Sequence, residues 1–120
     1  MKTKDLRIGN LVSLSGELPL TIIEINTVDF YAKDKKGENF KSSWADIQPI
    51  LITEELLLKL GAVKLYFKTF PCFNYKGMQI NCVRGMWIEY VSQIEILGLH
   101  HLQNIFYFRM CEELSIENLI

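Results

Sequence analysis

Thr53 and Gly61 enclose a short apolar segment near the middle of the chain, Glu54-Glu-Leu-Leu-Leu-Lys-Leu60. Thr53 is a residue type that caps helix N-termini, and Gly61 suits the left-handed position that ends a helix. The two glutamates lie in the first turn, where the helix dipole favours negative charge, so their presence needs no catalytic role. We therefore expect a helix over residues 54–60 that divides the chain into two strand-rich halves.

The first half, residues 1–50, consists of short alternating segments separated by turn residues. Apolar residues alternate within residues 6–14, where Gly9-Asn10 predicts a bend or bulge, and further strands are expected over residues 20–25, 28–32 and 40–44. The loop Asp34-Lys-Lys-Gly-Glu-Asn39 has the glycine placement of a tight hairpin. This pattern predicts a small, strongly bent antiparallel sheet, which we interpret as an SH3-like small β-barrel subdomain.

The second half, residues 51–120, starts with the linking helix and continues as an antiparallel meander. Residues 63–68, 71–75, 78–83, 86–91 and 93–97 are the strand candidates, with Lys76-Gly77 and Arg84-Gly85 as turns between them. After Gly98 the apolar spacing becomes helical and predicts a closing C-terminal helix. The expected fold class is α+β, with residues 1–50 and 51–120 as two subdomains that share one core.

Composition narrows the classes of function. The 13 basic and 14 acidic side chains nearly cancel, so no overall field attracts a polyanion. The three cysteines are widely spaced, and no nucleotide-binding glycine motif occurs, so we expect no cofactor, disulfide framework or zinc ribbon. With no signal-peptide pattern and no apolar run of the roughly 20 residues that cross a bilayer, we expect a cytoplasmic protein that does not bind membranes.

Both histidines stand side by side in His100-His101, which raises the question of a metal or catalytic site. Neighbours in a helix point about 100° apart, which makes them a poor chelating pair. Cys111 would lie about 15 Å further along an unbroken helix, too far to share an ion. We therefore expect helix-entry hydrogen bonding and packing here, with no metal and no catalytic residue. A metal site that uses either histidine is the weaker hypothesis.

A lysine-rich hairpin is the candidate for nucleic-acid binding, because basic loops beside aromatic residues can track a backbone and stack on bases. Three carboxylates in the same region, those of Asp29, Asp34 and Glu38, offset much of its charge. A solvated hairpin and a protein-binding surface are the other interpretations. The residues of the nucleic-acid hypothesis are Lys33, Lys35, Lys36, Lys41 and Trp44.

The meander of the second half holds more aromatic residues than one small sheet usually hides. Exposed aromatic side chains commonly anchor protein interfaces, so this surplus indicates a surface for a protein partner or for a second copy of the chain. The candidate partner-binding residues are Tyr66, Phe70, Phe73, Tyr75 and Trp87.

Three phrases of the sequence stand out: Leu6-Arg-Ile-Gly-Asn10, the junction Ile47-Gln-Pro-Ile-Leu-Ile-Thr-Glu-Glu55, and His101-Leu-Gln-Asn-Ile-Phe-Tyr-Phe108 with Glu112-Glu-Leu114. In these phrases the chain resembles a family of short uncharacterised proteins from Bacteroidetes and their phages and prophages. The resemblance implies no catalytic residue. It favours an accessory protein that binds a host or phage protein, such as an inhibitor of a host defence protein in the host cytoplasm. Our leading hypothesis is thus a small non-enzymatic interaction protein, and a nucleic-acid-associated module is the alternative.

Overall fold

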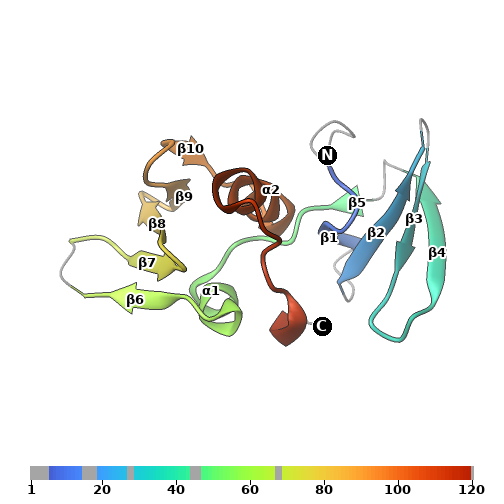
Figure 1. Cartoon of the computed structure of the whole chain (residues 1–120), viewed down its shortest axis with the longest axis horizontal. Coiled ribbons are helices and arrows are strands. Elements are labelled where there is room, and N and C mark those ends of the chain that lie inside the picture. The colour runs from blue at the N-terminus through green and yellow to red at the C-terminus, as the bar shows by residue number, and fades with distance from the viewer. Residues whose placement is uncertain (1–5, 15–18, 27–28, 44–46, 67–68, 120) are drawn as a thin grey trace. The chain divides into compact units, whose positions relative to one another are not determined.

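The computed structural model describes residues 6–14, 19–26, 29–43, 47–66 and 69–119. These residues form an α+β fold with two antiparallel sheets and two α-helices, as the sequence predicts (Figure 1). The contacts divide the chain into a first unit, residues 1–51 and 98–114 with residue 120, and a second unit, residues 52–97 and 115–119. No helix within the described ranges is long and apolar enough to cross a membrane.

The sheet of the first unit contains five strands: β1 (Leu11–Leu14), β2 (Leu20–Ile25), β3 (Asp29–Lys33), β4 (Asn39–Ser43) and β5 (Ile47–Gln48). Their order is β4-β3-β2-β1-β5, because β5 returns to pair antiparallel with β1. The antiparallel sheet expected for the first half is confirmed. Among the described strands β4 and β5 are sheet edges, so the sheet is open and does not close into a barrel.

Alternation along the strands places the apolar residues of the first unit on one face. Ile22 pairs with Ala32, and both are buried together with Phe30. The register between β2 and β3 shifts between Ile22 and Glu24, which is the irregularity of a β-bulge and leaves Ile23 exposed. The resulting core cluster comprises Leu6, Val12, Leu20, Ile22, Phe30, Ala32 and Ile47.

Helix α2 (Leu99–Met110) belongs to the first unit. It begins at Gly98, where an added Cβ would lie 2.8 Å from the Cβ of Pro49, so only glycine fits. The N–H of Leu99 donates to the carbonyl of Ile50 over 2.8 Å. The sequence pattern groups this helix with residues 51–120, its neighbours along the chain. Its contacts place it with the N-terminal sheet, because side chains of α2 bond directly to residues 7–11.

The second unit combines helix α1 (Glu54–Leu60) with a five-stranded meander. Both predicted caps of α1 are confirmed: Thr53 Oγ1 accepts the N–H of Leu56 over 3.1 Å, and Gly61 adopts φ 101°. The short helix η3 (Glu117–Leu119) contacts α1. The strands, in the order β10-β9-β8-β7-β6, are β6 (Val63–Leu65), β7 (Cys72–Tyr75), β8 (Met78–Val83), β9 (Met86–Glu89) and β10 (Ile94–Glu95).

Two tight turns connect the central strands of this meander. Lys76 and Gly77 have φ values of 47° and 93°, and Arg84 and Gly85 have φ values of 53° and 80°. Positive φ at both central residues defines the type I′ turn, whose twist matches that of the flanking strands. The sequence prediction of turns at both dipeptides is therefore confirmed.

Candidate functional site

A buried polar cluster joins α2 to the start of β1, and it brings together two of the three phrases on which the family resemblance rests. We call it the Arg7–Glu113 cluster; its members are Arg7, Asn10, Gln103, Asn104 and Glu113. The first two residues come from the turn before β1, and the others come from α2 and the segment after it. Residues about ninety positions apart thus share one hydrogen-bond network.

Gln103 is the centre of this cluster, with only 2% of its side chain surface exposed. Its Oε1 accepts the backbone N–H of Leu11 over 2.8 Å, and its Nε2 donates to the carbonyl of Gly9 over 3.1 Å. Asn10, also buried, accepts the N–H of Arg7 at Oδ1 and donates from Nδ2 to Asn104 Oδ1 over 2.9 Å. The amide side chains therefore satisfy backbone groups at the start of the sheet.

Arg7 closes the exposed side of the cluster. Its Nε donates to Asn104 Oδ1 over 2.9 Å, and its two terminal nitrogens form a fork with Glu113 at 2.7 and 3.2 Å. The guanidinium also lies 4.6 Å from the ring centroid of Tyr107. The polar groups of the cluster form hydrogen bonds with one another and with the backbone. This is the arrangement of a polar network that rigidifies the fold, and not of a reactive centre.

The histidine pair opens helix α2, as expected. His100 is buried and His101 is half-buried, with ring centroids 6.3 Å apart. Among the described residues, no group of three or more His, Cys, Asp or Glu side chains is placed to hold a metal ion. The three cysteines form no disulfide with one another: Cys72 is buried, Cys82 half-buried and Cys111 exposed.

The five candidate partner-binding aromatics do not form one exposed surface. Phe73, Tyr75 and Trp87 share one face of the C-terminal sheet, as their register with β8 requires. Phe73 and Tyr75 are buried there, and Phe73 packs against the ring of Trp87 with centroids 5.7 Å apart. Tyr66 and Phe70 lie in the connection between β6 and β7, where Tyr66 is exposed and Phe70 half-buried. Phe73 and Tyr75 are thus core residues, and partner binding by this set stays a prediction.

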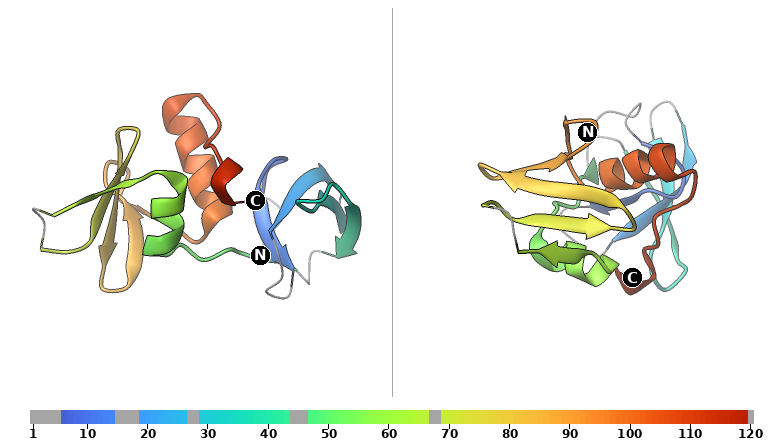
Figure 2. Two further views of the ribbon diagram at one scale, coloured as in Figure 1. Left: turned by 90° about the horizontal axis from the view of Figure 1, so that it is seen from below. Right: turned by 60° about the vertical axis from the view of Figure 1, so that its left-hand side comes forward.

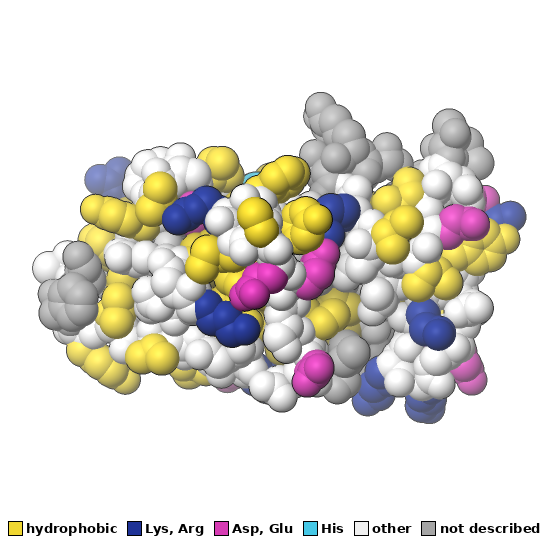
Figure 3. All heavy atoms as spheres, in the orientation of Figure 1, with side chains coloured by type: hydrophobic (Ala, Val, Ile, Leu, Met, Phe, Trp, Pro, Cys, Tyr) yellow, Lys and Arg dark blue, Asp and Glu magenta, His cyan; other side chains and the backbone are white. Residues whose placement is uncertain are grey.

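The opposite face of the same sheet carries the better candidate surface. We call it the open face; its partly exposed apolar members are Val63, Leu65, Val83, Met86 and Ile88. Val63 and Met86 are 62% and 44% exposed, and the other three are half-buried. Cys72 and Asn81, which the register places on the same face, are buried. Figure 3 shows apolar side chains, in yellow, over the part of the molecule that contains this sheet.

Polar residues on the open face are almost all uncharged. Asn74, Gln79 and Asn81 lie between the apolar residues, and Gln79 Nε2 donates to Asn81 Oδ1 over 3.1 Å. Glu95 is the single charged side chain that the five strands contribute to this face. The charged strand residues Lys64 and Glu89 lie on the other face, where Glu89 is buried and accepts N–H groups of the turn that follows it.

The lysine hairpin connects β3 to β4. Its loop is held by the Asp34 carboxylate, which accepts the N–H groups of Lys36 and Glu38 over 2.9 and 2.8 Å. Lys41 lies 3.4 Å from Asp29 and 5.8 Å from the ring centroid of Tyr31. The hydrogen bond to Asp29 raises the pKa of Lys41 above its ordinary value of 10.5.

The other three lysines of the hairpin, Lys33, Lys35 and Lys36, are exposed at its loop end. Figure 3 shows basic side chains, in dark blue, gathered at that end of β3 and β4. The structure thus brings four of the five residues of the nucleic-acid hypothesis onto one hairpin. The fifth, Trp44, lies outside the described residues.

Comparison of the chain with protein-family models, with curated proteins and with solved structures gives no match.

Proposed function

We propose that this protein acts by binding another protein and that it is not an enzyme. The observation that carries the proposal is the open face of the C-terminal sheet, where two exposed and three half-buried apolar side chains lie among amides and one carboxylate. Depletion of charge among partly exposed apolar residues is the compositional mark of the centre of protein interfaces. A solvated sheet face would instead carry mainly charged and polar side chains.

The class of partner follows from the family resemblance. Accessory proteins of phages and prophages act on proteins of the host or of the phage, and inhibition of a host defence protein in the host cytoplasm is the role we propose. The open face supports a stable contact with such a partner. The Arg7–Glu113 cluster would contribute by holding the fold rigid, not by touching the partner.

Charge placed on the open face tests this function. The intact protein with Met86→Asp should lose a stoichiometric partner that the wild-type protein captures from host lysate. Leu58→Asp is the matched control, because Leu58 is 50% exposed on α1 of the same unit and lies outside the open face. Equal capture by both variants, or turnover in a metabolite screen without any stoichiometric partner, would remove the proposal.

A second copy of the chain is the other occupant that an apolar face can accept. Size-exclusion chromatography with light scattering separates the two cases. A dimer that Met86→Asp converts to a monomer would assign the open face to self-association, whereas a monomeric wild-type protein leaves the face for a different partner.

Nucleic-acid binding is the second candidate function, and the exposed Lys33, Lys35 and Lys36 favour it. Neutralisation of phosphates releases counterions, so binding through this hairpin would weaken steeply as salt increases. Charge reversal of Lys35 and Lys36 should then abolish retention on a nucleic-acid column. Retention that is absent, or that does not change with salt, dismisses this candidate.

We also propose that residues 1–50 form an SH3-like unit. Two features support this fold: β5 returns to pair with β1 at the end of the meander, and the β2–β3 bulge increases the local bend of the sheet. Together they let a short sheet curl toward closure.

A further inference from the structure

The edges of the two sheets differ in how they are protected against an added strand. A sheet edge presents N–H and C=O groups that can pair with another chain, and proteins usually blunt it with short strands, proline or charge. Among the described strands, β5 and β10 have two residues each and β6 has three, and Pro49 directly follows β5. Strand β4 differs from them in length, because its edge runs over five residues without proline, and its only charged side chain is Lys41.

Strand β4 is the outermost described strand of its sheet, as Figure 1 and the left view of Figure 2 show. The N–H of Asp34 donates to the carbonyl of Glu38 over 3.0 Å, which marks residues 34 and 38 as a hydrogen-bonded pair. Bonded and non-bonded pairs alternate along an antiparallel ladder. The backbone groups of Asn39 and Lys41 therefore point away from β3, toward the position of an added strand.

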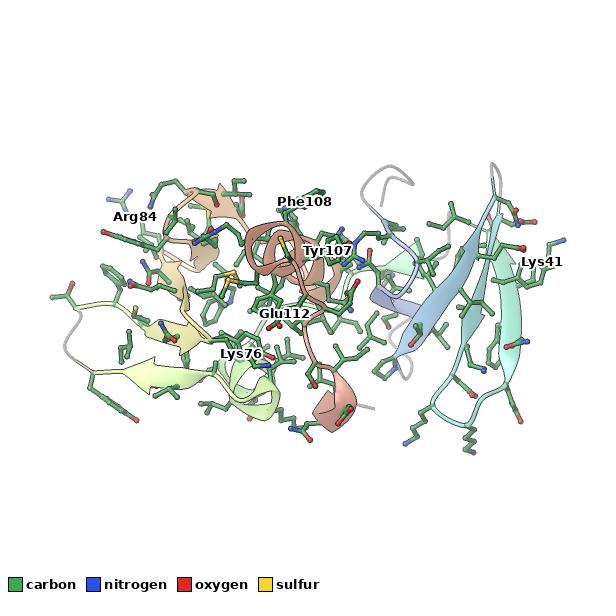
Figure 4. All side chains as sticks on the ribbon, in the orientation of Figure 1. Lys41, Lys76, Arg84, Tyr107, Phe108 and Glu112 are labelled. Carbon is green, nitrogen blue, oxygen red and sulfur yellow. The ribbon has the colours of Figure 1, made fainter. Side chains whose placement is uncertain are left out.

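The side chains of β4 define what an added strand should carry. Phe40 faces the core side of the sheet opposite Ala32, yet it is 40% exposed, so an apolar residue placed beside it would cover it. Lys41 faces the outer side, where Figure 4 shows it on β4 at the edge of the sheet. Lys35 and Lys36 at the loop end are exposed. The four lysines of the hairpin outnumber its three carboxylates, of which Asp29 lies 3.4 Å from Lys41.

Self-pairing of this edge is disfavoured. In the longest antiparallel register between two copies, the outward groups of Asn39 and Lys41 would set Lys41 directly opposite its own copy. Like charges at opposed positions destabilise a strand pair. The favoured occupant is therefore a strand of a different protein, with acidic residues on the outer side.

We propose that β4 is a docking edge for an extended segment of a partner protein in which apolar and acidic residues alternate. Main-chain hydrogen bonds to Asn39 and Lys41 would add the segment to the sheet, while Phe40 and the lysines select its side chains. This inference rests on the proposed function only in taking the partner to be a protein, and it does not require the open face.

The probe is an acetylated hexapeptide in which valine and glutamate alternate, followed by amide chemical shifts of the full-length protein. We expect saturable shifts centred on Asn39 and Lys41, and affinity three- to fivefold lower for the corresponding valine–lysine peptide. Lys41→Pro should abolish the shift at Asn39, because proline removes an outward N–H that an edge strand does not need for its own fold. Absent shifts, or shifts that map elsewhere, overturn the proposal.

Lys41→Glu is the second variant, and it keeps the test decisive if the proline variant fails to fold. It should reverse the preference in favour of the valine–lysine peptide, whereas Lys76→Glu in the β7–β8 turn should leave the preference unchanged. An unaltered preference in Lys41→Glu contradicts docking at β4. Met86→Asp should bind the peptide with the wild-type affinity. The experiment therefore tests docking at β4 separately from partner binding at the open face.

Discussion

The two sheets of this protein have similar sizes but depend on contacts of very different range. In the C-terminal sheet, turns of two residues at Lys76-Gly77 and Arg84-Gly85 bring β7, β8 and β9 together. The N-terminal sheet obtains two of its backbone hydrogen bonds from Gln103, a residue more than ninety positions away. The first arrangement can form from local sequence alone, whereas the second requires the closing helix, whose contacts carry a larger loop-closure cost.

The largest effect that separates the two sheets is expected from Gln103→Ala. The truncation removes the partner of the buried N–H of Leu11 and of the half-buried carbonyl of Gly9. An unsatisfied buried polar group costs roughly 1–3 kcal/mol, so the free energy of unfolding should fall by about 2–4 kcal/mol. Denaturant unfolding measures the change, and amide exchange should show that protection is lost in β1 and β2.

Gln79→Ala provides the matched control for this experiment in the C-terminal sheet. Gln79 is a half-buried amide that donates to another side chain, Asn81, and not to backbone. Its loss should cost less than about 1 kcal/mol. If Gln103→Ala were as mild as Gln79→Ala, the long-range cluster would not be what holds α2 to the sheet.

The local turns of the C-terminal sheet should be the next most sensitive positions. Gly85 has φ 80° and open space around a Cβ, so Gly85→Ala is opposed by backbone conformation alone. In denaturant unfolding, we expect Gly85→Ala to lower the free energy of unfolding by about 1 kcal/mol. Gly85→Asn should lower it by less, because asparagine tolerates the left-handed region.

A substitution at the neighbouring turn position should have the opposite effect on stability. Arg84, at φ 53°, occupies the first position of the type I′ turn, where asparagine is preferred. Arg84→Asn should therefore stabilise the protein by a few tenths of a kcal/mol. Destabilisation by Arg84→Asn would mean that the arginine side chain, and not turn geometry, maintains this hairpin.

This difference in range also explains which features could be predicted. Thr53, Gly61 and the two turn dipeptides act through their own neighbours, so the helix over residues 54–60 and both tight turns were predicted correctly. The attachment of α2 to the first sheet could not be predicted, because nothing in the local pattern of Gln103 indicates that its amide serves the backbone of residues 9 and 11.

The exposed face of the C-terminal sheet could not be located from the local sequence pattern either. Alternation assigns the strand residues of the C-terminal meander to two faces, but both faces carry apolar residues, so the pattern does not indicate which one is covered. Aromatic content selected Phe73 and Tyr75, which the structure buries. The useful signal was the near absence of charge on the opposite face, which becomes visible only once the register of the strands is known.

The C-terminal end of α2 is a second position where a substitution should stabilise the protein, here within the first unit. Cys111 caps the helix with φ 56°, a conformation that glycine adopts without strain. Cys111→Gly should raise the free energy of unfolding by about 0.5–1 kcal/mol. Cys111→Ala removes the thiol but keeps the strain, so it should leave stability nearly unchanged. An equal gain from both variants would attribute the effect to the thiol.

The smallest expected effect concerns Lys64 in the second unit, which lies 2.6 Å from Glu54 of α1. The hydrogen bond to Glu54 raises the pKa of Lys64 above its ordinary value of 10.5. Because the folded state binds this proton more tightly, the pair stabilises the fold at all pH values below about 10.5 at which Glu54 is ionised, and this contribution disappears as pH rises through the folded pKa. The difference in melting temperature between wild type and Lys64→Met should thus be present at pH 9 and shrink above pH 11. A difference that stays constant across this range would show that the lysine stem, packed near the rings of Tyr66 and Phe73, contributes the stability instead of the charge.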